Sequence, residues 1–356
     1  MLTRLALGDS AQRRLGIRLL AALGVVLALA CCESGPTDRT VHLAGSTMGT
    51  RYELKLVPDP GQTVPADFPV RVETLLADIN RQMSTYDPDS ELSRFNRNPS
   101  NDWIPASPEL VTVAEEGLRL GQLTDGAFDI TIGPLVNLWG FGPEPRPDQV
   151  PSEAAISQAR QQVGFRMLQL CHQPPALKKA RPDLSVDLSA LAKGYAVDQL
   201  AALAERHGIQ HFLVSIGGDV RAKGHNGHGQ AWTIAIERPV PGQRAVQRLL
   251  RLNDQAVSTA GDYRNFFEQD GQRYAHILDP RTGWPVARTV ASVTVIAASD
   301  LEADATDTAL MAAGAERGWQ LAVAHHIAAF FILVGANGEG FSERYTPEFA
   351  PFLQAD

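Results

Sequence analysis

Short β-rich runs and segments of helical periodicity are mixed along this chain without strict alternation, and this order constrains the fold most. Residues 52–56 alternate between apolar and polar, as a half-buried strand does. Residues 72–86 place apolar side chains at helical spacing, and Asp87-Pro88 ends that run. Because strict β-α alternation is typical of a doubly wound parallel sheet, the sequence instead predicts a single domain of the α+β class.

Further elements are expected in the same irregular order. Ser107 before Pro108 is a typical helix start, and this helix is expected to end near Thr124. The remaining expected elements are helices at 152–163 and 189–206, strands at 212–216, 232–236, 256–258 and 290–298, a hairpin of 328–334 and 341–345 around Asn337-Gly338, and surface insertions at 133–151 and 224–230.

Charge and cysteine content exclude two classes of protein. The formal net charge of -8 argues against a non-specific nucleic-acid binder, which needs a positive surface. The chain has 3 cysteines, of which only Cys171 lies in the body of the chain, and no Cys-x-x-Cys pair. This pattern argues against a disulfide scaffold or a thiolate metal cluster.

The first residues have the pattern of a targeting segment. Arg13, Arg14 and Arg18 precede an apolar run at 19–30 that is short for a membrane span but fits a signal peptide. The run ends in Leu29-Ala30-Cys31-Cys32, which resembles a bacterial lipoprotein signal, with a plain secretory signal or a short anchor helix as the alternatives. We expect a signal at 1–31 and lipid on Cys31 or Cys32, then a tether at 32–42 and a domain at 43–350. The mature protein would then be lipid-anchored on the periplasmic side of the bacterial inner membrane.

Two segments place polar groups next to glycine or a helix start. Lys193 follows Asp187 by six positions, close to an expected helix start, where backbone N–H groups favour a phosphate. The alternative is that Asp187 only caps the helix while Lys193 is solvated. The segment 215–219, Ser-Ile-Gly-Gly-Asp, is a weaker signal and is typical of a hairpin turn.

The sharpest local pattern lies between Ser299 and Thr308. Ser299 and Glu302 have the spacing of a capping box. Asp304 and Thr308 then lie one turn apart on the same helix face, and their oxygens suit Mg²⁺. The alternative is a solvated acidic helix start, but the surrounding alanines favour a half-buried face and therefore a metal site.

Six blocks, in this order along the chain, resemble the ApbE family of periplasmic FAD:protein FMN transferases. They are Met48-Gly49-Thr50; residues 83–86 with 90–96; residues 125–129 with 136–142; residues 192–198; residues 276–283; and residues 303–308. The resemblance extends from about Leu43 to Tyr345.

The resemblance implies a T-fold-like α+β domain that binds FAD as substrate and Mg²⁺ as cofactor. By matching motifs, the flavin nucleotide would contact Met48, Tyr86, Ala127, Phe128, Asp129, Asp187, Lys193 and Ile277. The metal would be held by Asp304, Thr308 and the backbone carbonyl of Ala190.

The implied reaction is the transfer of FMN from FAD to a threonine or serine hydroxyl, with release of AMP. That hydroxyl would belong to a flavin-carrying subunit of a membrane redox complex. A base is needed within hydrogen-bond reach of the hydroxyl, and His276 is the first candidate, with Asp307 as the alternative. Two other functions remain open: hydrolysis of FAD to FMN and AMP, and FAD binding by a lipoprotein without catalysis.

Overall fold

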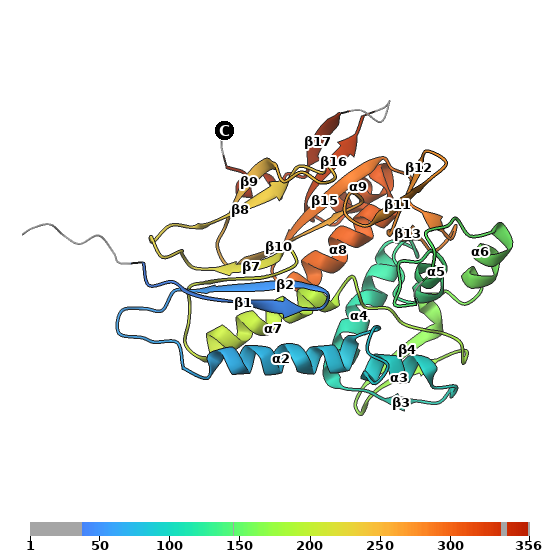
Figure 1. Cartoon of the computed structure of the whole chain (residues 1–356), viewed down its shortest axis with the longest axis horizontal. Coiled ribbons are helices and arrows are strands. Elements are labelled where there is room, and N and C mark those ends of the chain that lie inside the picture. The colour runs from blue at the N-terminus through green and yellow to red at the C-terminus, as the bar shows by residue number, and fades with distance from the viewer. Residues whose placement is uncertain (1–37, 145, 336–339, 355–356) are drawn as a thin grey trace, which may run out of the picture. The chain divides into compact units, whose positions relative to one another are not determined.

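An eight-stranded, entirely antiparallel sheet organises the fold (Figure 1). The computed structural model describes residues 38–144, 146–335 and 340–354, and those from Arg39 onward belong to one compact unit. The strands in spatial order are β1 (Val41–Thr47), β2 (Thr50–Leu56), β6 (Phe212–Ile216), β7 (Asp219–Lys223), β10 (Gln255–Gly261), β15 (Val290–Ala297), β16 (Ala328–Val334) and β17 (Phe341–Tyr345). The antiparallel order confirms the predicted α+β class.

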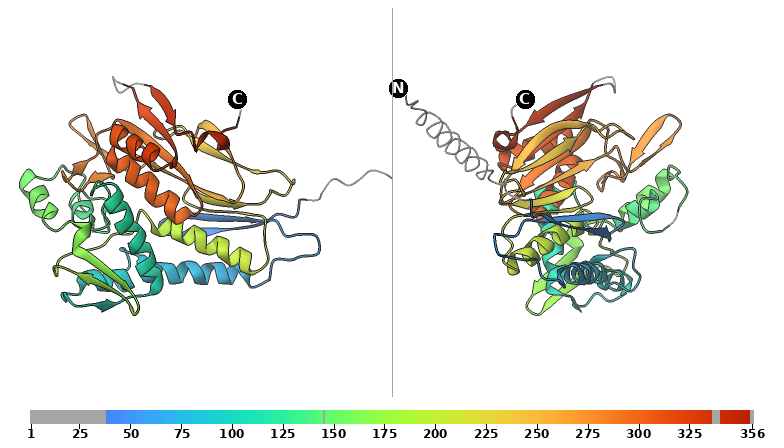
Figure 2. Two further views of the ribbon diagram at one scale, coloured as in Figure 1. Left: turned by 180° about the vertical axis from the view of Figure 1, so that it is seen from behind. Right: turned by 60° about the vertical axis from the view of Figure 1, so that its left-hand side comes forward.

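Helices cover one face of this sheet, and strands cover the other (Figures 1 and 2). The helices are α2 (Phe68–Met83), α3 (Glu91–Arg97), α4 (Pro108–Leu123), α5 (Gly133–Leu138), α6 (Glu153–Arg160), α7 (Ala192–Arg206), α8 (Asp300–Ala313) and α9 (Ala315–Ala324). The smaller sheets are β3 (Ile104–Pro105) with β5 (Pro175–Lys179) and β4 (Leu168–His172); β8 (Trp232–Glu237) with β9 (Val246–Leu252); β11 (Phe266–Gln269) with β12 (Gln272–Ala275); and β13 (Leu278–Asp279) with β14 (Trp284–Pro285).

Strand alternation explains why both faces of the sheet are buried. In β6, Phe212 and Val214 pack into the core formed with α2 and α7, whereas Leu213 points to the opposite core. That second core contains Trp232 of β8 and Leu250 of β9. A sheet with two covered faces needs apolar residues at successive positions, and β6 has them.

Several predicted elements are confirmed, with shifted ends. Ser107 caps α4 through its hydroxyl, which accepts from the Leu110 N–H at 3.3 Å. The helix predicted to reach residue 86 ends at Met83. Beyond it, the Ser84 hydroxyl accepts from the Tyr86 and Asp87 N–H groups, each at 3.1 Å, and forms a turn. The helix predicted at 189–206 begins at Ala192, because the Asp187 carboxylate accepts from the Ser189 N–H at 2.8 Å ahead of the helix.

The prediction of a surface insertion at 133–151 is wrong for its first part. Residues 133–138 form α5, and Leu135 and Trp139 are fully buried. The Trp139 ring packs at 5.3 Å from the Trp284 ring, and its Nε1–H donates to the Gly283 carbonyl at 2.9 Å. The helix predicted at 152–163 also ends early, at Arg160.

The N-terminal predictions fall outside this description. Cys31, Cys32 and the predicted signal belong to residues 1–37, and the predicted Asn337-Gly338 turn belongs to 336–339. The two strands that flank that turn, β16 and β17, do pair antiparallel. None of the described helices is both long and apolar enough to cross a membrane.

Candidate active site

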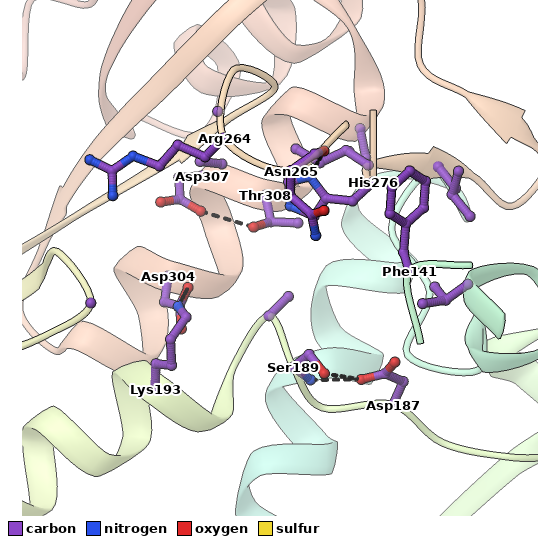
Figure 3. A pocket seen from close by; sticks show the side chains of 18 of the residues that line it. Phe141, Asp187, Ser189, Lys193, Arg264, Asn265, His276, Asp304, Asp307 and Thr308 are labelled. Atoms are coloured by element: carbon purple, nitrogen blue, oxygen red, sulfur yellow. Dashed lines mark hydrogen bonds and ion pairs between the residues drawn. The ribbon is translucent and has the colours of Figure 1, made fainter. Parts of the chain in front are cut away.

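A cavity of about 480 Å³ opens beside the first turn of α7 and the part of α8 from Asp304 to Ala312 (Figure 3). Its walls come from the turn between β6 and β7, the end of β10, the segments around residues 127–132 and 187–193, and helix α8. These segments are far apart in the sequence, and the pairing of β7 with β10 and the packing of α7 on α8 bring them together.

The cavity collects nearly all of the predicted site residues. The predicted flavin contacts among its lining are Tyr86, Ala127, Phe128, Asp129, Asp187, Lys193 and Ile277. The predicted metal ligands Ala190, Asp304 and Thr308 line it as well, as do the two candidate bases, His276 and Asp307.

Met48 is the exception. It lies in the turn between β1 and β2 with a positive φ of 48°, and its side chain packs against the core under the sheet. The structure therefore does not bring Met48 to the cavity. The Met-Gly pair makes a tight strand-to-strand turn, since Gly49 also has a positive φ of 71°.

Lys193 is clamped between two aspartates that come from different elements. Its Nζ donates to Asp219 Oδ2 at 2.5 Å and to Asp304 Oδ1 at 2.9 Å. Burial disfavours the charged lysine, but the two carboxylates raise the pKa of Lys193 well above its usual value. The interpretation of Lys193 as a solvated side chain is therefore wrong.

The acidic face of α8 is buried rather than solvated. Asp300, Asp304 and Asp307 are at most 4% exposed. Burial, followed by the charge of Asp219, raises the pKa of Asp304 to about 7. Burial also raises the pKa of Asp307, and its Oδ2 atom has no hydrogen-bond partner.

The charges of the cavity lining suit a divalent cation. The cavity lining contains six carboxylates, Asp129, Asp187, Asp219, Glu237, Asp304 and Asp307, against two permanent cations, Lys193 and Arg264. The unpartnered Asp307 Oδ2 and the Thr308 hydroxyl supply hard oxygens, which Mg²⁺ prefers. In the part of the chain that the structure describes, no three His, Cys, Asp or Glu side chains converge as a metal site. Mg²⁺ would therefore need oxygens from backbone, substrate or water as well.

His276 is held so that one ring nitrogen is left to take a proton. Its Nδ1 lies 3.1 Å from the Asn265 carbonyl, which accepts only and so assigns the proton to Nδ1. Nε2 of the neutral ring is then the basic nitrogen. Burial lowers the pKa of His276 below 6.5, so the ring is neutral at pH 7.

Comparison with known proteins gives a consistent result. The sequence model of the ApbE family matches residues 48–331. The chain is 46% identical to the FAD:protein FMN transferase of Vibrio cholerae, with 94% of this chain and 98% of the relative covered. It is 39% identical to the FAD:protein FMN transferase of Escherichia coli K12, with 95% and 97% covered.

The chain belongs to the ApbE family.

Solved structures agree with this assignment. The flavin transferase ApbE from Vibrio cholerae superposes with a TM-score of 0.82 at 45% identity, covering 88% of this chain and 99% of that one. The apo flavinyl transferase ApbE of Pseudomonas stutzeri gives 0.81 at 39% identity, covering 90% and 98%. The predicted ApbE-type fold is confirmed.

Sequence reasoning missed several lining residues of this ApbE-family cavity. The sequence pattern predicts a hairpin turn before Asp219, and β6 and β7 do form that hairpin, but the Asp219 carboxylate also accepts from Lys193. An acid directly after Gly-Gly was the available signal. Glu237, Arg264 and Asn265 had no comparable signal, because only the three-dimensional fold brings them to the cavity.

The buried Asp304 predicts a pH-dependent stability for the metal-free protein. A carboxyl with a pKa of 3.8 when unfolded and about 7 when folded binds more protons in the native state between those values. The free energy of unfolding therefore falls as the pH rises from about 4 to about 7. Asp304→Asn flattens this fall in urea titrations, whereas the exposed Asp102→Asn does not. An unchanged pH dependence in Asp304→Asn contradicts the assignment.

Proposed function

We propose that this chain is an FAD:protein FMN transferase that moves FMN from FAD to a threonine or serine hydroxyl of an acceptor protein and releases AMP. The single observation that carries the proposal is the cavity itself, which joins a buried acidic cluster to a histidine with a free basic nitrogen. The relatives from Vibrio cholerae and Escherichia coli are FAD:protein FMN transferases, which supports the same activity here.

Mg²⁺ is the cofactor we assign to the acidic cluster. Asp304, Thr308 and the Ala190 carbonyl would hold it, with Asp307 beside them. When bound, the ion would offset the negative charge that builds up on the diphosphate and on the leaving AMP. The surplus of carboxylates over cations in the cavity supports this assignment, since FAD brings further negative charge.

His276 supplies the base in this proposal. Its Nε2 takes the proton of the acceptor hydroxyl as the oxygen attacks the phosphorus on the FMN side. A bond forms between that oxygen and phosphorus, and the bridging bond to the adenylate breaks. Burial lowers the pKa of His276 although the bond from Nδ1–H to the Asn265 carbonyl raises it, so the ring is neutral at pH 7. Asp307, with its unpartnered oxygen and raised pKa, is the alternative base.

The acceptor and location are also part of the proposal. We place the protein on the periplasmic side of the inner membrane, with a lipid on Cys31 or Cys32, and its acceptor in a membrane redox complex. The support is the arginine-rich, apolar N-terminal pattern that ends in two cysteines.

Replacing His276 separates catalysis from FAD binding. His276→Ala is expected to bind FAD about as well as the wild type and to transfer FMN about 10²–10⁴-fold more slowly in a single turnover. In the wild type, the rate falls as the pH drops through the pKa of His276, which burial holds below its ordinary value, because the imidazole becomes protonated. This acidic limb disappears in the variant.

The exposed His172 provides the matched control, since it contacts Glu115 rather than the cavity. His172→Ala keeps both the rate and the acidic limb. If His276→Ala transfers FMN at the full rate, the base is Asp307 or the substrate itself. If the variant loses FAD binding, His276 contacts FAD and is not assigned as the base.

Replacing both N-terminal cysteines tests the location. A Cys31→Ser, Cys32→Ser double variant is expected to leave the membrane fraction and still transfer FMN, because neither residue lies in the cavity-forming part of the chain. Fractionation without detergent, followed by an activity assay on each fraction, checks this. A variant that stays with the membrane shows that acylation is not the anchor.

A further inference from the structure

The cavity has two permanent cations among its described lining residues, and one of them is already saturated with carboxylates. Lys193 donates to Asp219 and Asp304, both of which are nearly fully buried. Turning this ammonium toward a phosphate would leave two buried carboxylates unpaired, which is strongly unfavourable. The other cation, Arg264, pairs with a single carboxylate, that of Glu237.

Arg264 has a partner that it can leave easily. Its Nη2 donates to Glu237 Oε2, at the end of β8. The Arg264 side chain is 58% exposed and the Glu237 side chain 20%, so water reaches the guanidinium and weakens the pair. Tyr263 also donates to Glu237 Oε2, at 3.1 Å, so Glu237 keeps a hydrogen bond when the guanidinium moves away.

The backbone under Arg264 is fixed on both sides. Asp262, which is 4% exposed, pairs with Arg288 Nε at 3.3 Å. Asn265 holds His276 through its carbonyl, which accepts from both the ring Nδ1–H and the backbone N–H of His276 at 3.1 Å. A change of partner by Arg264 is therefore a side-chain movement, which leaves the base in place.

Arg264 lines the same cavity as Asp304, Asp307 and Thr308, beside which we place the metal and therefore the diphosphate. Figure 3 shows its side chain among those that line this cavity. A guanidinium offers a planar pair of N–H donors that matches two oxygens of a phosphate. A diphosphate is a stronger partner for it than one partly solvated carboxylate.

We propose that Arg264 binds the diphosphate of the dinucleotide substrate, exchanging Glu237 for phosphate oxygens when FAD enters. This inference rests on the proposed function. In the free protein Glu237 holds the guanidinium at the cavity wall, and in the complex Glu237 stays bonded to the Tyr263 hydroxyl. Burial raises the pKa of Tyr263 to about 12, so that hydroxyl remains a donor.

The test compares two flavins that differ in their phosphates. Equilibrium binding of FAD and of riboflavin, which has no phosphate, is measured by flavin fluorescence in the wild type, Arg264→Gln and Glu237→Gln. We expect Arg264→Gln to weaken FAD binding about tenfold or more and to reduce its dependence on salt. Riboflavin affinity stays the same, and Glu237→Gln binds FAD at least as tightly as the wild type because the competing carboxylate is gone.

Arg71→Gln is the matched control, since Arg71 on α2 is also exposed and ion-paired, with Asp67, and does not line the cavity. FAD affinity within twofold of the wild type in Arg264→Gln overturns the inference, as does an equal loss of riboflavin and FAD binding. A wild-type protein that binds no FAD contradicts the proposed function itself, which is a different result.

Discussion

The Lys193 ammonium, held between Asp219 and Asp304, is the interaction on which the site depends. It joins the first turn of α7 to the start of β7 and to the middle of the acidic face of α8. The Gly194 N–H adds a bond to Asp304 Oδ2 at 3.0 Å, so both oxygens of this buried carboxylate are bound. A side chain at position 194 would collide with the Asp300 carbonyl, because a Cβ there would lie 2.3 Å from that oxygen. Close packing of α7 on α8 therefore needs glycine at this position.

The same clamp leaves the site electrostatically unbalanced. Asp300 and Asp307 are as buried as Asp304 but have no lysine of their own. Their raised pKa values come first from burial and then from the neighbouring carboxylates. A folded protein keeps such a cluster only at the expense of stability, unless a cation or a proton compensates it. The proposed Mg²⁺ would provide that balance and would also offset the further negative charge that FAD brings.

Sequence reasoning found the parts of this site that are local in the chain. The Ser299 cap and the shared face of Asp304 and Thr308 follow from helical spacing, and the structure contains both. It did not predict how deeply this face is buried, because burial depends on α7 and on β10, which are distant in sequence. Lys179 is a similar case, since it is fully buried. Its Nζ lies within hydrogen-bond distance of three backbone carbonyls at the end of α3 and of the Pro182 carbonyl, contacts that no local pattern indicates. The family resemblance implies most of the lining residues. It also implies Met48, which lies in the turn between β1 and β2 and is not among the residues that line the cavity.

Simultaneous measurement of AMP release and acceptor modification tests the central claim most directly. The protein is incubated with FAD, Mg²⁺ and a threonine-containing flavoprotein subunit. The released AMP is quantified, and the mass of the intact subunit is measured by mass spectrometry. The account predicts one AMP for each FMN joined to the subunit by a phosphoester bond at one hydroxyl, and neither product without Mg²⁺. Equal amounts of AMP and free FMN, with the subunit unmodified, contradict it and indicate hydrolysis of FAD.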